Sequence, residues 1–501
     1  MAETMTMHWL DWVVVALFFV LVLWVGIRSG KNINSSTDFF VGGGKIPWWM
    51  SGISHHVSGY SGVVFVGYAG IAYAQGMSIY FWWAVNIALA TALASVTIIP
   101  RWPRLRRALG IESPTEYLQM RYNRAAQLLI AISGIGSKLL DVAAKWTSIG
   151  ILLHGFTGMP IWVGVIVSGL ISLIYIAIGG ILADLWTDFI QFIVQVIAGL
   201  ALFIGVIMKL GDYGLSIFSV FSALPEANVS VFNAGRGQGS LSWTLLYFFV
   251  IFFSYSGGTW NLAARFISTS NAKEAKKAGL FSAALYLVWP FILFFPMWCG
   301  PLLFPGMEAS LYATLTNTFL PVGMVGLVLA SMFANTMTMC NSDANTISAV
   351  LTRDILPIFN PKILQASERK SLWYARITTI IFTALTVFVA LFSDYFGGVT
   401  GLILTWFSAL LGPTAIPLLL GLFPAFKYCD AKAAIISVLA GLSVFVLTKM
   451  GFTMEADIAL IAPLAVSFVF YAGIGLINKY ALKMQVKPEV EDLMVKLGKD
   501  E

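Results

Sequence analysis

Several ionisable side chains lie inside stretches of this 501-residue chain that are otherwise apolar. They are His55, His56, Lys138, Asp141, Lys145, Asp184, Asp188 and Asp343. A charged group at bilayer depth is costly, so it faces a bundle interior, pairs with another charge or lines a water pathway. These residues are therefore the first candidates for chemistry, which could be metal binding, catalysis or transport.

Two adjacent histidines in the stretch GISHHVSGYSG (52–62) raise the question of a metal centre. Adjacent residues on a helix point about 100° apart, so His55 and His56 do not readily chelate one ion. The chain has only four histidines, too few for a membrane di-iron site. Asp188 and Asp343 could form a proteolytic carboxylate pair, but no proteolytic motif surrounds them. We therefore expect neither an enzyme nor a cofactor.

Segment 47–75 is longer than one straight span, and its centre is rich in glycine and serine. Such a composition lets a helix unwind and expose backbone carbonyls, which is where secondary transporters bind substrates and coupling ions. Close helix packing through small residues is the alternative interpretation of this segment.

A second polar patch, FANTMTMCNSDANTIS, lies within segment 318–350. Asn335, Thr338, Ser342 and Thr346 are spaced so that several share one helix face, and Asp343 adds a carboxylate. Hard cations prefer oxygen ligands, so this face favours sodium and leaves the two histidines as bystanders or solute contacts.

Lys138, Asp141 and Lys145 follow one another at i, i+3 and i+7, so they can pair along one helix face. Two interpretations remain open. The trio either forms a neutralised ion pair that steadies the bundle or contributes to the electrostatics of a substrate site or gate.

The elements that must position these groups are membrane helices. The chain is 58% hydrophobic and 11% charged, with a mean hydropathy of +0.84, whereas a soluble chain carries about 25% charged residues. Each span needs roughly 20 apolar residues and must be helical. We predict an all-α integral membrane protein of about thirteen transmembrane helices: 8–27, 47–75, 78–101, 125–155, 161–179, 183–210, 243–266, 275–304, 318–350, 373–394, 398–425, 431–450 and 456–478.

Basic residues are concentrated in alternate loops, and the carboxy-terminal tail shares their side. The positive-inside rule then predicts a multi-pass cell-membrane protein with its amino terminus outside and its carboxy terminus in the cytoplasm. This distribution accounts for the net charge of +6, so we expect the lipid bilayer as partner, with no nucleic acid and no obligate protein partner.

Four motifs, in order, resemble the sodium/solute symporter family, which includes the sodium–glucose cotransporters. They are STDFFVGGGKIPWWMSGIS, AIGGILADLWTDFIQ, ARFISTSNAKEAKKAG and NSDANTISAVLTRDIL. The resemblance covers about residues 8–480. It implies two inverted five-helix repeats, the arrangement of the bacterial leucine transporter, with Na+ as the coupling ion.

On this resemblance the chain divides into five parts. They are a first helix and loop (1–46), repeat 1 (47–210), an extracellular loop (211–242), repeat 2 (243–425), and two final helices with the tail (426–501).

The resemblance also implies sodium ligands. The first site falls on Val57 and Tyr60 and on the eighth core helix at Asn335, Thr338 and Met339. Met339 replaces a hydroxyl-bearing residue, so this site has lost one oxygen. A possible second sodium site falls on Asp188, Asn341 and Ser342, and Asp343 could supply a compensating charge.

The substrate positions of sugar-transporting relatives are altered in this chain. The candidate solute contacts are His55, His56, Gly59, Val64, Trp83, Thr259, Trp260 and Asn261, with Tyr60, Trp82, Tyr255 and Lys138 beside them. Aromatic faces suit a sugar ring or a cation. We expect a sodium-coupled importer of a sugar or sugar derivative; the alternatives are an organic anion as the solute, or a sensor or channel-like protein on the same fold.

Overall fold

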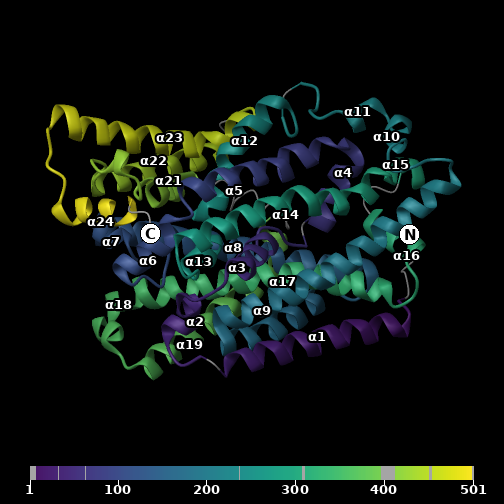
Figure 1. Cartoon of the computed structure of the whole chain (residues 1–501), viewed down its shortest axis with the longest axis horizontal. Helices are drawn as coiled ribbons and strands as arrows, with labels where there is room; N and C mark the ends of the chain where they lie inside the picture. The colour runs from purple at the N-terminus through teal and green to yellow at the C-terminus, as the bar shows by residue number, and fades with distance from the viewer. Residues whose placement is uncertain are drawn as a thin grey trace.

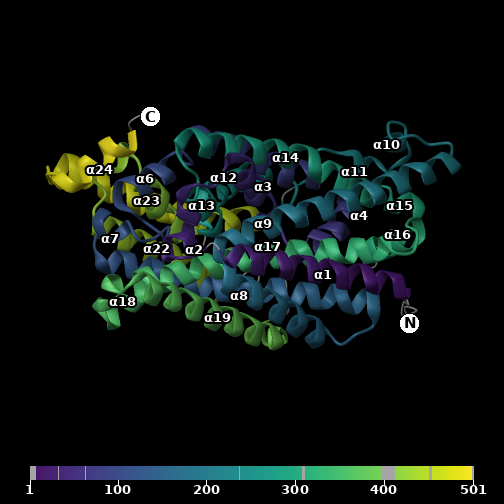
Figure 2. The ribbon, with the colours of Figure 1, turned by 60° about the horizontal axis from the view of Figure 1, so that its bottom comes forward.

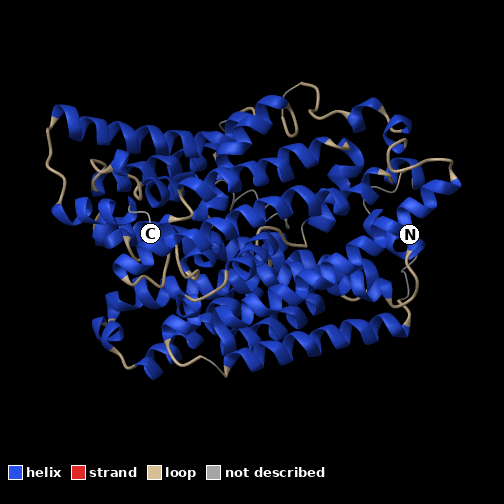
Figure 3. Ribbon diagram, in the orientation of Figure 1, coloured by secondary structure: helices blue, strands red, loops and turns tan. Residues whose placement is uncertain are grey.

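The computed structural model describes residues 7–31, 33–62, 64–235, 237–306, 311–396, 412–450 and 454–498. These residues form helices joined by loops (Figure 3), and the only β-pairing among them is an isolated bridge between Ile46 and Thr269. The prediction of an all-α chain is therefore confirmed for the described part of the sequence.

Nine helices in the described residues are long and apolar enough to cross a membrane. They are α1 (Trp9–Gly30), α5 (Asn86–Thr97) with the π-turn before it, α8 (Arg124–Thr157), α9 (Ile161–Asp212), α12 (Leu241–Phe253) with the π-turn after it, α14 (Ala272–Trp298), α17 (Met324–Val350), α19 (Glu368–Leu391) and α23 (Ala456–Leu476).

The remaining predicted spans are shorter or broken. Segment 431–450 matches α22 (Ala431–Lys449), and 398–425 ends in α21 (Gly412–Leu420), while its residues 398–411 lie outside the described part. Segment 47–75 becomes α3 (Trp48–Val57), a π-turn (Val64–Tyr68) and α4 (Ala69–Gln75). The predicted break in this segment is thus present, at residues 58–62.

Short helices complete the chain between and after the spans. They are α2 (Ser36–Val41), α6 (Arg101–Leu109), α7 (Leu118–Arg121), α10 (Val220–Ala223), α11 (Glu226–Val229), α13 (Asn261–Ile267), α15 (Gly300–Leu303), α16 (Leu311–Phe319), α18 (Leu356–Phe359) and α24 (Pro488–Gly498).

The predicted boundary between the spans 161–179 and 183–210 lies within α9. Two helical segments meet there at Gly180, whose φ of 50° and ψ of −142° are non-helical. A Cβ at this position would also meet the carbonyl oxygen of Phe39 on α2. A glycine is therefore what lets α9 bend around α2 without a loop.

The span 243–266 is broken instead of continuous. It divides into α12, a π-turn (Ser254–Gly258) and α13, with Gly257 at φ 117°. Trp260 has a φ of 65°, a left-handed conformation that costs a non-glycine residue about 1–3 kcal/mol. Within the described part of the chain, α3–α4 and α12–α13 are thus broken helices.

The long helices run roughly along one axis, and the two ends of the chain lie at opposite ends of the bundle (Figures 1 and 2). Helix α17 packs against α9, α8 and α1, while α3 packs against α14 and α9. This arrangement brings the break after α3 next to the polar face of α17.

Candidate functional site

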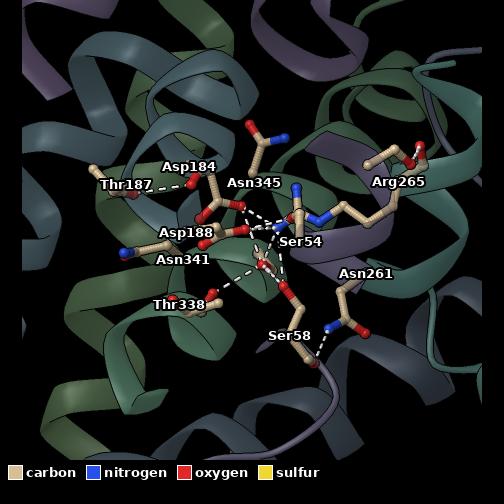
Figure 4. Close-up of polar contacts among 12 residues, drawn as sticks. Ser54, Ser58, Asp184, Thr187, Asp188, Asn261, Arg265, Thr338, Asn341 and Asn345 are labelled. Carbon is tan, nitrogen blue, oxygen red and sulfur yellow. Dashed lines mark hydrogen bonds and ion pairs between the residues drawn. The ribbon is translucent and has the colours of Figure 1, made fainter. Parts of the chain in front are cut away.

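A cluster of three buried charged residues joins α9 to α13. The Arg265 guanidinium of α13 bonds to Asp184 and lies 3.5 Å from Asp188 Oδ2 on α9. Figure 4 shows both carboxylates turned toward the end of this arginine. Because two carboxylates face one guanidinium, one formal negative charge is uncompensated within the cluster. One oxygen of each carboxylate, Oδ1, has no hydrogen-bond partner among the described residues.

Hydroxyl groups from two further helices complete this cluster. Ser54 of α3 donates to Asp188, and Ser342 of α17 donates to Asp184 Oδ2 at 3.1 Å. Arg265 also donates to Ser342. Two of the three residues predicted for the second sodium site, Asp188 and Ser342, are therefore brought together, whereas the third, Asn341, donates to Tyr175.

The residues predicted for the first sodium site meet where α3 ends. Val57 is the last residue of α3 and Tyr60 lies in the break. Ser58 Oγ lies 3.0 Å from Ser342 Oγ, and the Gly62 N–H donates to Thr336 Oγ1 at 3.1 Å, so the break contacts α17 directly. The break therefore lies against the oxygen-bearing face of α17, while two of its carbonyls, Gly59 O and Ser58 O, accept from the Tyr255 hydroxyl and from Asn261 Nδ2.

The three residues of α17 that were predicted for the first sodium site differ in their hydrogen-bond partners. Thr338 Oγ1 donates to the Gln191 amide oxygen of α9. The Asn335 side chain is fully buried, and neither its Oδ1 nor its Nδ2 has a partner among the described residues. Met339 lines the adjacent cavity. The Thr338 hydroxyl is thus engaged with α9, whereas the Asn335 side-chain amide is unengaged among the described residues.

A second buried charge cluster, which we call the four-charge ring, joins α8 to α17. Lys138 Nζ lies 3.2 Å from Asp141 Oδ2 and 2.6 Å from Asp343 Oδ1. Lys145 Nζ lies 2.6 Å from Asp141 Oδ2 and 2.6 Å from Asp343 Oδ2. Asp343 is therefore held by two lysines, and its role as a compensating charge at the sodium site stays a prediction.

A cavity of about 140 Å³ lies between the break, α8 and the α12–α13 break. Its polar lining includes Ser58, Ser61, Lys138, Asp141, Lys145, Ser254, Thr259 and Asn261. Its aromatic lining is Tyr60, Tyr68, Trp83, Tyr247 and Tyr255. Among the predicted solute contacts, Gly59, Val64, Trp83, Thr259 and Asn261 line this cavity.

The remaining predicted solute contacts lie outside the cavity lining. His55 is fully buried, with Nδ1 2.7 Å from Ser282 Oγ and Nε2 3.2 Å from Tyr255 O. His56 Nε2 lies 3.2 Å from the Tyr60 hydroxyl. Trp260, with its left-handed backbone, is also fully buried. In this conformation the histidines and Trp260 support the walls of the cavity without facing into it.

Arg265 is the main functional candidate that sequence reasoning missed. It lies in the motif ARFISTSNAKEAKKAG and inside the predicted span 243–266, but the set of intramembrane ionisable residues does not include it. The signal that could have found it was two intramembrane aspartates, Asp184 and Asp188, with no cation assigned to them, because a buried charge needs a partner.

The bundle, its two broken helices and the cavity beside them match known secondary transporters. A substrate-bound, outward-open Na+-coupled sialic acid symporter superposes with a TM-score of 0.81 at 20% identity, covering 93% of this chain and 97% of that chain. The nucleobase-cation-symport-1 family transporter Mhp1 gives a TM-score of 0.57. The fold is that of the leucine-transporter-like secondary transporters.

Residues 39–441 match the Sodium:solute symporter family, and the chain belongs to that family. It is 26% identical over 457 residues to the sodium/iodide cotransporter of Homo sapiens, which covers 86% of this chain and 68% of the relative. It is also 26% identical over 492 residues to the sodium/sialic acid symporter NanT of Aliivibrio fischeri, and the match covers 92% of this chain and 90% of that relative. The protein is therefore a Na+-coupled symporter of the membrane and not an enzyme.

Proposed function

We propose that this symporter imports a sugar or sugar derivative down the sodium gradient by alternating access. The observation that carries the proposal is the break at residues 58–62, which places both a solute-sized cavity and the oxygen-bearing face of α17 at one point of the bundle. Discontinuous helices at the midplane are where secondary transporters hold solute and ion together.

The proposed first sodium site lies between the end of α3 and α17. Its ligands are the carbonyls of Val57 and Tyr60, the Thr338 hydroxyl and an oxygen of Asn335. Met339 takes the place of a fifth oxygen. A second cation site at Asp188 and Ser342 is supported by the uncompensated negative charge of the Asp184–Asp188–Arg265 cluster, and Asn341 joins it if its bond to Tyr175 opens.

The proposed architecture has inverted repeats at 47–210 and 243–425. The two broken helices fall at corresponding places, because each lies in the first span of its repeat. The distribution of basic loops supports an outside amino terminus and a cytoplasmic carboxy terminus.

The cavity supports a solute with an apolar face and several hydroxyl groups. Trp83 and the cavity tyrosines offer aromatic faces, while Asn261 and Thr259 offer hydrogen bonds. An organic anion is the second candidate, favoured by the ammonium groups of Lys138 and Lys145 in the cavity wall. Relatives named for glucose, sialic acid and monocarboxylate span both candidates.

Uptake into proteoliposomes tests the proposal. Neutral sugars, acidic sugars and monocarboxylates are offered with an inward sodium gradient or an equal potassium gradient. We expect sodium-dependent accumulation of a neutral sugar. Accumulation of acidic sugars or monocarboxylates without neutral sugars would favour the organic anion, and no accumulation of any solute would favour a sensor or channel-like protein.

A pair of adjacent tryptophans provides a matched control for the cavity. Trp83 lines it, whereas Trp82 is equally buried but packs on Trp243 and Tyr247. Trp83→Ala should raise the half-saturating solute concentration at least about tenfold, as expected for losing a buried aromatic contact, and Trp82→Ala should change it far less. Equal effects would show that the solute does not contact Trp83.

A further inference from the structure

A basic groove lies at the end of the bundle where α5 ends and α14 begins. Its lining includes the side chains of Arg101 and Arg104 on α6 and of Lys273 and Lys276 on α14, and its volume is about 550 Å³. No acidic residue is among the described residues that line it. Helices α5 and α14 pack against each other there, with α6 and α24 close by (Figure 1).

The two arginines are held by backbone carbonyls. Arg101 donates from Nη1 to Leu422 O at 3.0 Å, and its guanidinium lies 4.3 Å from the centre of the Phe423 ring. Arg104 donates from Nη1 to Leu497 O of α24 at 2.9 Å. For Arg101, the carbonyl orients the guanidinium without neutralising its charge. Burial, and next the charge of Arg104, lower the pKa of Arg101, as expected for crowded cations.

The lysines add to this positive field at the start of a long helix. Lys273 and Lys276 lie in the first turns of α14, whose amino terminus is capped by Asn271. The positive end of a helix dipole favours an anion at this position. The nearby Glu274 carboxylate pairs with Lys277 at 2.8 Å and does not line the groove.

An apolar track continues from the groove along the membrane-facing side of α5 and α14. Leu89, Leu93 and Val96 of α5 are 55%, 45% and 56% exposed and share one face at i, i+4 and i+7. Leu280 and Leu287 of α14 are exposed as well. Both helices are membrane spans, so these side chains meet acyl chains. The groove and the track together fit an amphiphile with an anionic head.

We propose that this groove binds the headgroup phosphate of an anionic phospholipid, with the acyl chains lying along α5 and α14. Basic pockets between transmembrane helices are suited to such headgroups. A free phosphate would use the same four cations but would gain nothing from the apolar track, so we assign the site to a lipid. The site is separate from the cavity and does not depend on which solute is carried.

Lipid titration of the purified full chain tests the proposal. Native mass spectrometry and thermal shift are followed as phosphatidylglycerol, phosphatidylcholine or inorganic phosphate is added in detergent. We expect phosphatidylglycerol to bind most tightly. The double variant Lys273→Gln/Lys276→Gln should weaken phosphatidylglycerol binding at least about tenfold, because each basic residue near an anionic lipid contributes substantially.

The matched control is Lys432→Gln/Lys487→Gln, which removes the same charge from exposed positions outside the groove lining. It should bind phosphatidylglycerol as the unaltered chain does. Equal weakening by both double variants, equal binding of phosphatidylcholine, or equal stabilisation by inorganic phosphate would overturn the lipid assignment. Each of the four lysines is also substituted alone, so that lipid binding can still be compared if a double variant does not fold.

Discussion

The two buried charge clusters of this protein use similar groups in opposite ways. In the four-charge ring, each of two lysines contacts both aspartates, and the formal charges cancel. In the Asp184–Asp188–Arg265 cluster, two carboxylates face one guanidinium, and two carboxylate oxygens have no partner among the described residues.

This difference in charge balance determines what each cluster can do. A compensated ring gains nothing from another ion, so it fixes α8 against α17 and holds the charge of the cavity wall constant. A cluster with excess negative charge is stabilised by a cation, and it joins α9 and α13 to Ser54 of α3, which ends at the break. We expect the ring to govern stability and the Asp184–Asp188–Arg265 cluster to govern sodium dependence.

The largest expected effect concerns the ring. Asp343→Asn leaves two buried lysines facing one carboxylate, and breaking a buried ion pair costs about 3–5 kcal/mol. Thermal unfolding in detergent should show a large fall in stability. The control is Asp212→Asn, which removes a 64% exposed carboxylate from a surface pair with Lys209 and should matter little.

A double variant tests directly whether the charges of the four-charge ring compensate each other. Lys145→Met combined with Asp343→Asn leaves Lys138 paired with Asp141, so the charges balance again. We expect the double variant to be more stable than Asp343→Asn alone, by more than about 1 kcal/mol. A double variant no more stable than the single one would mean that the ring is not a charge-compensated unit.

The next effect concerns sodium. Asp188→Asn leaves the neutral Asp184–Arg265 pair in place, so it should destabilise the fold less than Asp343→Asn does. Removing the excess charge should raise the sodium concentration for half-maximal uptake about tenfold, which corresponds to about 1.4 kcal/mol. If Asp188→Asn lowers stability as much as Asp343→Asn and leaves sodium dependence unchanged, the contrast between the clusters is wrong.

Two changes on neighbouring residues of α17 should act in opposite directions. Thr338→Ala removes a hydroxyl from the proposed first site and should raise the half-saturating sodium concentration a few-fold. Met339→Ser supplies the missing oxygen and should lower it by a similar factor, since one polar contact contributes about 0.5–1.5 kcal/mol. Sodium titration of uptake measures both, and shifts in the same direction would place the site elsewhere.

The smallest expected effect concerns His56. The sequence alone predicts that His56→Ala alters solute affinity more than sodium affinity. In the structure His56 does not line the cavity and contacts Tyr60, which does. We therefore expect the half-saturating solute concentration to change only a few-fold, with sodium dependence unchanged. Complete loss of solute binding would instead make the histidine a direct contact.

Much of the fold and part of the site could be predicted from local composition. Glycine and serine at 58–62 predicted the break in segment 47–75, since these residues weaken a helix wherever they fall. The spacing of Asn335, Thr338 and Ser342 predicted an oxygen-bearing face on α17. The break after α12 was missed, although its residues 254–260, SYSGGTW, carry the same glycine and serine signal as residues 58–62.

Partners distant in the chain could not be predicted. Lys138, Asp141 and Lys145 lie within eight residues of one another, so their pairing followed from helix periodicity. Asp343 is about 200 residues further along, and only packing of α17 on α8 joins it to the lysines. The same holds for Arg265 and its aspartates on α9.

The sequence by itself determined that the chain is a helical membrane protein, that segment 47–75 breaks and that one face of α17 carries oxygen, because hydropathy, small residues and helical spacing act locally. Only the tertiary structure decided which buried charges compensate each other, which residues line the cavity and which pack behind it. Those outcomes depend on distances between helices. An unpaired buried charge strongly destabilises the fold, so the packing of the helices must bring each charge to its partner.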